Sequence, residues 1–310
     1  MQIVHQKLKP IATMIRNTAT ILARHRGSLF ASPSFTGKFS HGAFITGRSL
    51  STATRESTNL EDLPAHLEKL APSIAESLVE KGYFTTIPLL DHSVMDTLRE
   101  QAVALRQEGR YEQSWSEKIQ EHNGQVIRFD KPGVFACEPD GADYDTAPDL
   151  VTYTSHLITN LPSYLNIYLP ENVARISKQA FNAKLAYTES HSEYPLHVDN
   201  SLGLSGGDTR KLTCILYLNP EYDREAHKGE LRVHLLNDEF VDLEPSTRFV
   251  CFWTDEIPHK VLMTGDSQGM DRYALTIWLA DEEPQHIHNS SSKFAELRIQ
   301  AFDKGQEGDG

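Results

Sequence analysis

The chain has 310 residues, of which 39% are hydrophobic and 24% are charged, a composition that excludes collagenous, disulfide-stapled and wholly disordered proteins. The formal net charge is -13, but residues 1–55 contain eight Lys or Arg and no Asp or Glu, so the remainder carries 22 basic against 43 acidic residues, or -21. Because such a body repels phosphate backbones, the sequence predicts no nucleic-acid partner.

Residues 1–55 have the composition of an organellar transit peptide, rich in Ser, Thr, Ala and Arg and without acidic residues. Apolar residues between Val4 and Leu22 recur on one helical face, although Pro10 interrupts the first turn. They never form the continuous apolar run of a secretory signal. We therefore expect a transit peptide, with a disordered leader as the alternative. The expected location is intracellular and mitochondrial, with a plastid or the cytoplasm as the other locations.

The sequence predicts no membrane span, because its longest uncharged window, residues 150–170, is interrupted by polar residues and by Pro162. The three cysteines, Cys137, Cys214 and Cys251, are widely spaced and odd in number. This spacing indicates neither a disulfide framework nor a CxxC metal site, and it fits a reducing compartment.

Residues 60–180 are predicted to form a helical support that contains one strand and one long excursion. Apolar residues at helical spacing, followed by the stop at Gly82, predict a first helix over residues 63–82. The other expected elements are a strand at 83–87, a helix capped by Asp91 or Ser93 and ending at Gly109, an irregular stretch over 110–149 with a hairpin around 126–135, and a helix over 150–178 that restarts at Pro162.

From Phe181 onward the hydrophobic period changes to two. Short strands are predicted at 184–188, 212–218, 230–235, 239–243, 249–253, 260–263 and 273–279. Many short strands between turn residues indicate an all-β core, a double-stranded β-helix or jelly roll over 181–285, flanked by α-helices from the N-terminal half. Residues 60–285 are therefore expected to form one domain, and the polar tail 286–310 is expected to fray from Asn289.

His197 and Asp199 stand two positions apart in a segment that looks extended, so both side chains leave the same face. His259, at the start of a later strand, is the best placed third ligand. Two His and one carboxylate form the facial triad that binds Fe(II) and leaves coordination positions open. The short motif alone is weak, because a surface His beside a turn-forming Asp-Asn has the same pattern.

Arg272 opens a strand in which alternation places it on one face with Thr276 and Trp278. A buried guanidinium is costly unless an anion neutralises it, and a bound dicarboxylate would be such an anion. The alternative places Arg272 on a solvated face in a surface ion pair.

An ordered series of motifs joins these residues. It consists of HVDN at 197–200, LTCILYLN at 212–219, GELR at 229–232, LEP at 243–245, FWTD at 252–255, PHKV at 258–261 and RYALTIW at 272–278. This series resembles the catalytic domain of 2-oxoglutarate- and Fe(II)-dependent prolyl 4-hydroxylases, with the hypoxia-inducible-factor-type enzymes the nearest in pattern. The resemblance covers about residues 60–285.

The resemblance implies a cofactor set and a set of site residues. It implies that Fe(2+) is held by His197, Asp199 and His259, and that L-ascorbate keeps the iron reduced. It further implies that 2-oxoglutarate is bound by Arg272, Tyr217, Thr276 and Tyr187. The three aromatic residues Tyr187, Tyr217 and Trp278 could instead be plain core residues.

The same resemblance implies that Trp278 lines the site near the target proline and that Arg128 and Asp130 lie over the substrate. A solvated charge cluster is the alternative for Arg128 and Asp130. Leu196 stands where the animal hypoxia-type enzymes have arginine, and the spacing from His259 to Arg272 is longer than in them. Both differences lie near the substrate entrance.

The implied function is hydroxylation of an unactivated C–H bond, most simply of a prolyl residue in a protein or peptide, with succinate and CO2 as co-products. One alternative is the same chemistry on a free amino acid or other small molecule. Two others are a jelly-roll metalloenzyme that does not use 2-oxoglutarate and a binding module without catalysis. The sequence leaves the oligomeric state open.

Overall fold

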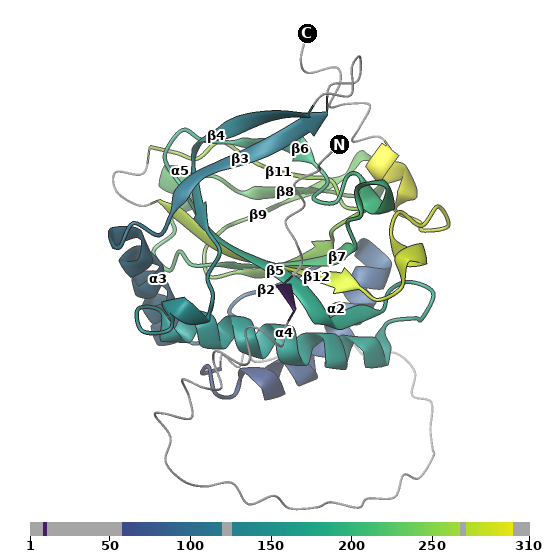
Figure 1. Ribbon diagram of the computed structural model, residues 1–310, viewed down its shortest axis with the longest axis horizontal. Helices are drawn as coiled ribbons and strands as arrows, with labels where there is room; N and C mark the ends of the chain where they lie inside the picture. The colour runs from purple at the N-terminus through teal and green to yellow at the C-terminus, as the bar shows by residue number, and fades with distance from the viewer. Residues whose placement is uncertain (1–8, 11–57, 120–125, 267–270, 300–310) are drawn as a thin grey trace, which may run out of the picture.

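Two antiparallel sheets face each other in the computed structural model, which describes residues 9–10, 58–119, 126–266 and 271–299 (Figure 1). The large sheet has the order β2 (Tyr83–Thr86), β10 (Phe249–Trp253), β7 (Arg210–Tyr217), β12 (Arg272–Asp281), β5 (Ile176–Thr188), β4 (Val126–Cys137) and β3 (Glu112–Ile119), and β1 (Lys9–Pro10) also pairs with β5. The small sheet has the order β6 (Tyr194–His197), β11 (His259–Val261), β8 (Leu231–His234) and β9 (Phe240–Leu243). The predicted jelly-roll core is confirmed.

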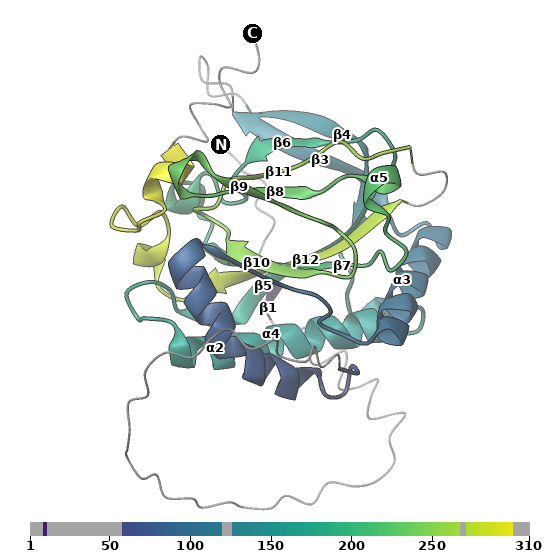
Figure 2. The same ribbon diagram turned by 180° about the vertical axis from the view of Figure 1, so that it is seen from behind.

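Three helices cover the outer face of the large sheet: α2 (Leu63–Lys81), α3 (His92–Gln107) and α4 (Pro148–Tyr168) (Figure 2). Apolar residues of α2 at helical spacing, among them Leu67, Ile74 and Leu78, are fully buried in the core. The indole Nε1 of Trp253 in β10 donates to the carbonyl of Leu78 at 2.9 Å, which ties the sheet to the helix. The remaining helical turns are α5 (Arg224–His227), η1 (Gly141–Asp143), η2 (Gly203–Gly206), η3 (Leu236–Asp238) and η4 (Pro284–His286).

The third long helix differs from its prediction both at Pro162 and at its C-terminal end. α4 continues through Pro162 and ends at Tyr168, and the residues from Ile176 onward already belong to β5. Pro162 is tolerated because Leu161 and Leu165 beside it are buried, so tertiary packing outweighs one lost helical hydrogen bond. The side-chain amide of Asn166 donates to the carbonyl of Ile176 at 2.8 Å and accepts from its backbone N–H at 2.9 Å. This pair of hydrogen bonds fixes the start of the strand.

The excursion over 110–149 is more regular than predicted. β3 and β4 form an antiparallel hairpin that extends the large sheet, and the predicted hairpin within 126–135 is wrong because those residues form a single strand. Pro132 and Gly133, which suggested a turn, lie inside β4, where Gly133 has a φ of 66°. The hairpin crosses from the large sheet toward β6 of the small sheet (Figure 1).

The predicted leader and tail lie largely outside the described residues. Of residues 1–55 only Lys9 and Pro10 are described, and they pair with Ala180 and Phe181 as a strand, not as part of a helix. The tail is ordered further than predicted, because Phe294 and Leu297 are buried. Among the described helices none is both long and apolar enough to cross a membrane.

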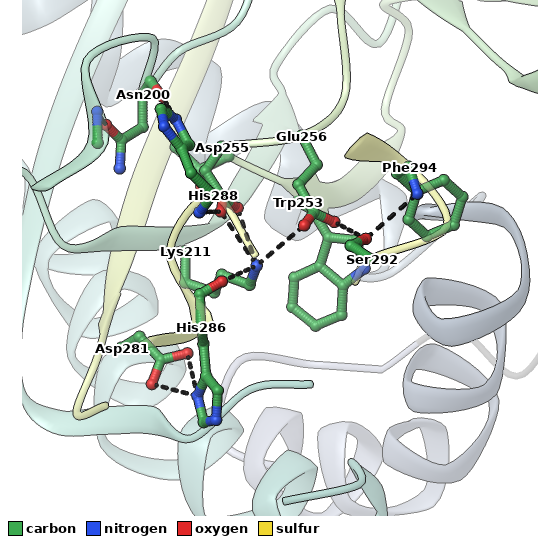
Figure 3. A network of polar contacts seen from close by, with 12 residues as sticks. Asn200, Lys211, Trp253, Asp255, Glu256, Asp281, His286, His288, Ser292 and Phe294 are labelled. Carbon is green, nitrogen blue, oxygen red and sulfur yellow. Dashed lines mark hydrogen bonds and ion pairs between the residues drawn. The ribbon is translucent and has the colours of Figure 1, made fainter. Parts of the chain in front are cut away.

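A buried lysine holds this C-terminal segment against the barrel (Figure 3). The ammonium of Lys211 lies 3.0 Å from a carboxylate oxygen of Asp255 and 3.7 Å from one of Glu256, and it donates to the carbonyl of His286 at 3.0 Å. His288 in turn donates its backbone N–H to Asp255 at 2.9 Å. The paired charges make the burial of Lys211 tolerable.

We predict that Gly82→Ala destabilises the protein by about 2–4 kcal/mol, because φ is 81° and a Cβ would lie 2.4 Å from Cδ1 of Ile257. The free energy of unfolding is measured by urea denaturation. Gly109→Ala is the control, since Gly109 also has a positive φ, 74°, but nothing lies within 4 Å of its Cβ position. Its cost should be about 1 kcal/mol, and equal losses in the two variants would contradict the prediction.

Candidate metal and cosubstrate site

The three predicted metal ligands meet at one point of the small sheet. His259 opens β11 and is the direct cross-strand partner of His197 at the end of β6, and Asp199 follows two residues later. Nε2 of His197 lies 3.3 Å and Nε2 of His259 lies 3.6 Å from Oδ1 of Asp199. One ligand atom from each residue lies within 4.8 Å of the others, so the set can hold one metal ion.

Backbone carbonyls orient both imidazoles. Nδ1 of His197 lies 2.8 Å from the carbonyl oxygen of Pro195, and Nδ1 of His259 lies 3.1 Å from that of Ile257. With Nδ1–H as the donor in each ring, Nε2 carries the free lone pair. A metal ligand needs this tautomer and this orientation.

Two donors from the large sheet fix the carboxylate of Asp199. The hydroxyl of Thr213 in β7 donates to Oδ2 at 3.0 Å, and the indole Nε1 of Trp278 in β12 donates to the same oxygen at 2.9 Å. Oδ1 therefore remains directed at the imidazoles. The hydroxyl of Thr213 also lies 2.9 Å from that of Thr254, which completes its hydrogen bonding.

The protonation states of the ligands suit a metal at neutral pH. Burial, together with the nearby His197, lowers the pKa of His259 to about 4. Burial alone would raise the pKa of Asp199, but charge interactions with His259 and His197 and a hydrogen bond from His197 outweigh it and hold that pKa well below the usual value. A neutral imidazole and an ionised carboxylate are the forms that coordinate metal. Two nitrogen donors and one oxygen donor with the remaining positions open fit Fe(II).

Arg272 lies on the same face of the large sheet as Trp278, as the alternation predicted. Its Nη2 donates to the hydroxyl of Tyr217 at 3.1 Å, and its Nε donates to the carbonyl of Gly229 at 3.1 Å. Among the described residues, no carboxylate lies within 4.0 Å of this guanidinium. Thr276 lies on the same face, between Arg272 and Trp278. These three side chains form a row along β12 from the guanidinium of Arg272 to the indole that hydrogen-bonds Asp199.

The structure does not bring Tyr187 to this group. Tyr187 is the cross-strand partner of Tyr273, which is one residue from Arg272 and therefore on the opposite face of the sheet. There its ring stacks on Phe135 at 4.9 Å between centroids and lies under the guanidinium carbon of Arg106 at 3.8 Å. The contacts of Tyr187 in the structure are therefore those of a packing aromatic residue, and its role in cosubstrate binding stays a prediction.

Arg128 and Asp130 are exposed side chains of the β3–β4 hairpin. The guanidinium carbon of Arg128 lies 4.2 Å from the ring centroid of Trp115 within the same hairpin. Within the part of the chain that the structure describes, neither side chain forms a hydrogen bond or ion pair with a metal ligand.

Sequence reasoning missed two lysines beside the metal ligands. Lys184 lies directly opposite Thr276 on the inner face of β5, and the ammonium of Lys131 in β4 lies 3.8 Å from the ring centroid of Tyr194, which packs on His197. Burial lowers the pKa of each to about 8, and for Lys184 the like charge of Lys131 adds to the shift. Both ammonium groups remain mostly charged at neutral pH. The alternation along β5 was the available signal for Lys184.

Comparison with known proteins agrees with this geometry. Residues 183–280 match the family model described as the 2OG-Fe(II) oxygenase superfamily. The chain is 33% identical over 138 residues to prolyl hydroxylase EGLN3 of Mus musculus, covering 44% of this chain and 54% of that protein. It is 30% identical over 160 residues to Egl nine homolog 1 of Rattus norvegicus, covering 51% and 40%. The chain thus spans about half the length, or less, of the curated relatives it matches.

Solved structures share the fold. A prolyl hydroxylase from Trichoplax adhaerens, in complex with a hypoxia inducible factor peptide fragment, has a TM-score of 0.56 and 23% identity and covers 71% of this chain and 93% of its own. A prolyl 4-hydroxylase from Phytophthora capsici has a TM-score of 0.56 and 22% identity, with coverages of 82% and 79%. The resemblance predicted from the sequence is confirmed.

We predict that Thr213→Val lowers the affinity for a divalent metal by about ten- to one-hundredfold, because Oδ2 of Asp199 loses one of its two orienting donors. The affinity is measured by competition with a chelator, using Co(II) as an air-stable probe. Thr146→Val is the control, since its hydroxyl donates to Glu108 at an exposed position. An unchanged affinity in Thr213→Val would show that Trp278 alone orients the carboxylate.

Proposed function

We propose that this chain, whose residues 183–280 match the 2OG-Fe(II) oxygenase superfamily, is a 2-oxoglutarate- and Fe(II)-dependent dioxygenase that hydroxylates a prolyl residue. The observation that carries the proposal is that the metal triad and Arg272 face the same interior space between the two sheets. His197, Asp199 and His259 face one point, and a row of side chains on the large sheet connects that point to an arginine with no carboxylate among its described partners. A metal and a dicarboxylate are the two ligands that such an interior fits.

Each residue has a role in this proposal. When bound, Fe(II) and 2-oxoglutarate supply the chemistry that inserts one oxygen atom of O2 into a C–H bond, with succinate and CO2 as co-products. His197, Asp199 and His259 would hold the iron. Arg272 would pair with the distal carboxylate of 2-oxoglutarate, and Tyr217 orients its guanidinium through the 3.1 Å hydrogen bond.

The remaining inner residues would position the reactants. Trp278 keeps Asp199 in place and adds an apolar wall that excludes water beside the ligands. Thr276 lies on the path between Arg272 and the metal ligands, where its hydroxyl can accept or donate a hydrogen bond to 2-oxoglutarate. Arg128 and Asp130, exposed on the hairpin, remain candidates for contact with a peptide.

The choice of a prolyl substrate is supported by the names of the similar proteins, which are prolyl hydroxylases. A free amino acid or another small molecule is the alternative substrate for the same chemistry. L-ascorbate is proposed as the reductant of the iron by resemblance alone. A metalloenzyme that does not use 2-oxoglutarate is less well supported, because it leaves Arg272 without an anion.

The assignment of residues 1–55 as a mitochondrial transit peptide is likewise proposed on their basic, acid-free composition. The assignment of residues 60–285 as one catalytic domain is supported by the helices α2, α3 and α4, which pack on the sheet that carries Arg272.

The deciding experiment incubates the purified protein with Fe(II), 2-oxoglutarate and O2, together with proline-containing peptides or free amino acids. Formation of succinate that depends on both Fe(II) and 2-oxoglutarate supports the oxygenase class. A mass increase of one oxygen atom on a peptide proline supports the prolyl substrate. Succinate without any modified prolyl residue would reject the substrate and keep the class.

We predict that Arg272→Met raises the 2-oxoglutarate concentration for half-maximal succinate formation by about ten- to one-hundredfold, because a charge-assisted pair with a carboxylate is lost. Titration of 2-oxoglutarate at saturating Fe(II) measures the change. Arg175→Met is the control, because Arg175 is exposed and its ion pair with Glu282 spans 3.7 Å. A titration curve unchanged in Arg272→Met would remove Arg272 from the cosubstrate site.

A further inference from the structure

Two lysines project into the barrel beside the candidate metal site. Lys184 stands on the inner face of β5, opposite Thr276 of β12, and its ammonium donates to the hydroxyl of Ser114 at 3.2 Å. Lys131 comes from β4, and its ammonium lies over the ring of Tyr194. The ring of Tyr194 packs edge-on against His197, with 4.3 Å between centroids. The two ammonium groups therefore flank the metal ligands from the side of the hairpin.

Neither lysine has a carboxylate within 4.0 Å among the described residues. Lys184 donates to one hydroxyl, Lys131 lies over one aromatic ring, and the charge of Asp199 acts on both from farther away. Lys211 in the same chain shows the opposite arrangement. It is buried and is surrounded by Asp255, Glu256 and the carbonyl of His286 (Figure 3). Lys131 and Lys184 are half-buried, and the carboxylate that acts on both, Asp199, would be engaged by the metal ion. A partly desolvated ammonium group is stabilised by a close counter-ion, so an anion from outside the chain would complement the two positions.

The proposed ligands of the oxygenase do not supply that anion. Fe(II) and Arg272 would contribute positive charge that the two carboxylates of 2-oxoglutarate and the carboxylate of Asp199 balance. Arg210, the other cation near Asp199, is already paired with Asp208 at 2.6 Å. The charges of Lys131 and Lys184 then remain uncompensated after both ligands are bound.

Lys184 is the cross-strand neighbour of Thr276, but the position of Lys131 directs the pair away from Arg272 and Tyr217. Arg272 and Tyr217 lie on β12 and β7, whereas Lys131 belongs to the hairpin that crosses from the large sheet toward β6 (Figure 1). An anion bound between Lys131 and Lys184 would lie on the hairpin side of the metal ligands.

We propose that Lys131 and Lys184 form an anion-binding pair that recognises a carboxylate of the substrate to be hydroxylated. This inference rests on the proposed oxygenase function and names a substrate class for it. The carboxylate has two chemical sources: an Asp or Glu side chain close to the target residue of a peptide, or the α-carboxylate of a free amino acid.

Direct binding tests the proposal without turnover. The protein, loaded with Fe(II) and 2-oxoglutarate, is titrated by calorimetry in the absence of O2. The probes are proline peptides that carry one Glu at successive positions around the proline, their Gln counterparts, free L-proline and L-prolinamide. Either a Glu peptide should bind about ten- to one-hundredfold more tightly than its Gln counterpart, or L-proline should bind more tightly than L-prolinamide by the same factor.

Substitutions assign the effect to the pair. Lys184→Met and Lys131→Met should each remove most of the preference for the acidic probe, while a calorimetric or circular dichroism melt checks that each variant folds. Lys178→Met is the matched control, because Lys178 is an exposed residue of the same strand β5. It should keep the full preference.

The outcomes separate this inference from the proposed function. Equal binding of acidic and neutral probes to the unmodified protein overturns the anion-binding pair. So does a Lys184→Met variant that keeps the preference but needs more 2-oxoglutarate for succinate formation, since the lysine then serves the cosubstrate. Absence of succinate under all conditions instead overturns the oxygenase proposal, and the binding titrations still decide whether the pair takes a carboxylate.

Discussion

Two hydrogen bonds to one carboxylate oxygen join the sheets of this barrel at the point where the metal ligands meet. Oδ2 of Asp199 accepts from Thr213 of β7 and from Trp278 of β12, so a residue that follows a strand of the small sheet is held by the large one. The cross-strand register of His197 and His259 sets the other two ligands. The metal geometry therefore depends on the spacing of the two sheets, and the helices that support the large sheet contribute to it from the outer side.

The sign of the charge changes between the outside and the inside of the domain. The chain beyond residue 55 carries -21, whereas the space beside Asp199 collects three cations, Arg272, Lys184 and Lys131, none of which has a carboxylate within 4.0 Å among the described residues. The net negative charge of the chain beyond residue 55 does not attract a dianion such as 2-oxoglutarate over long distances. Its recognition must therefore depend on cations close to the bound molecule. Short-range pairing inside a water-poor barrel is stronger than the same pairing on the surface.

The jelly roll and the shared face of His197 and Asp199 could be predicted because both follow from a period of two along short strands, whereas the full triad with His259 was implied by the resemblance of the motif series. Tyr187 was assigned by the resemblance alone, and its register with Tyr273 turns it away from Arg272. Lys184 was missed because a lysine in a strand is usually assigned to solvent; the alternation along β5 pointed to it, and the pairing of β5 with β12 places it inside. The restart predicted at Pro162 rested on the local propensity of proline, and the packing of α4 outweighs that propensity, so the helix continues through it.

The positions of the three tryptophans give the protein a built-in set of optical reporters. Trp278 donates to a metal ligand, Trp253 joins β10 to α2, and Trp115 lies under Arg128 in the hairpin. Indole emission depends on the immediate surroundings of the ring, so the three residues report separately on the metal site, on the contact between β10 and α2, and on the β3–β4 hairpin. Variants that retain one tryptophan at a time would assign the fluorescence signal of each ring to its own part of the structure.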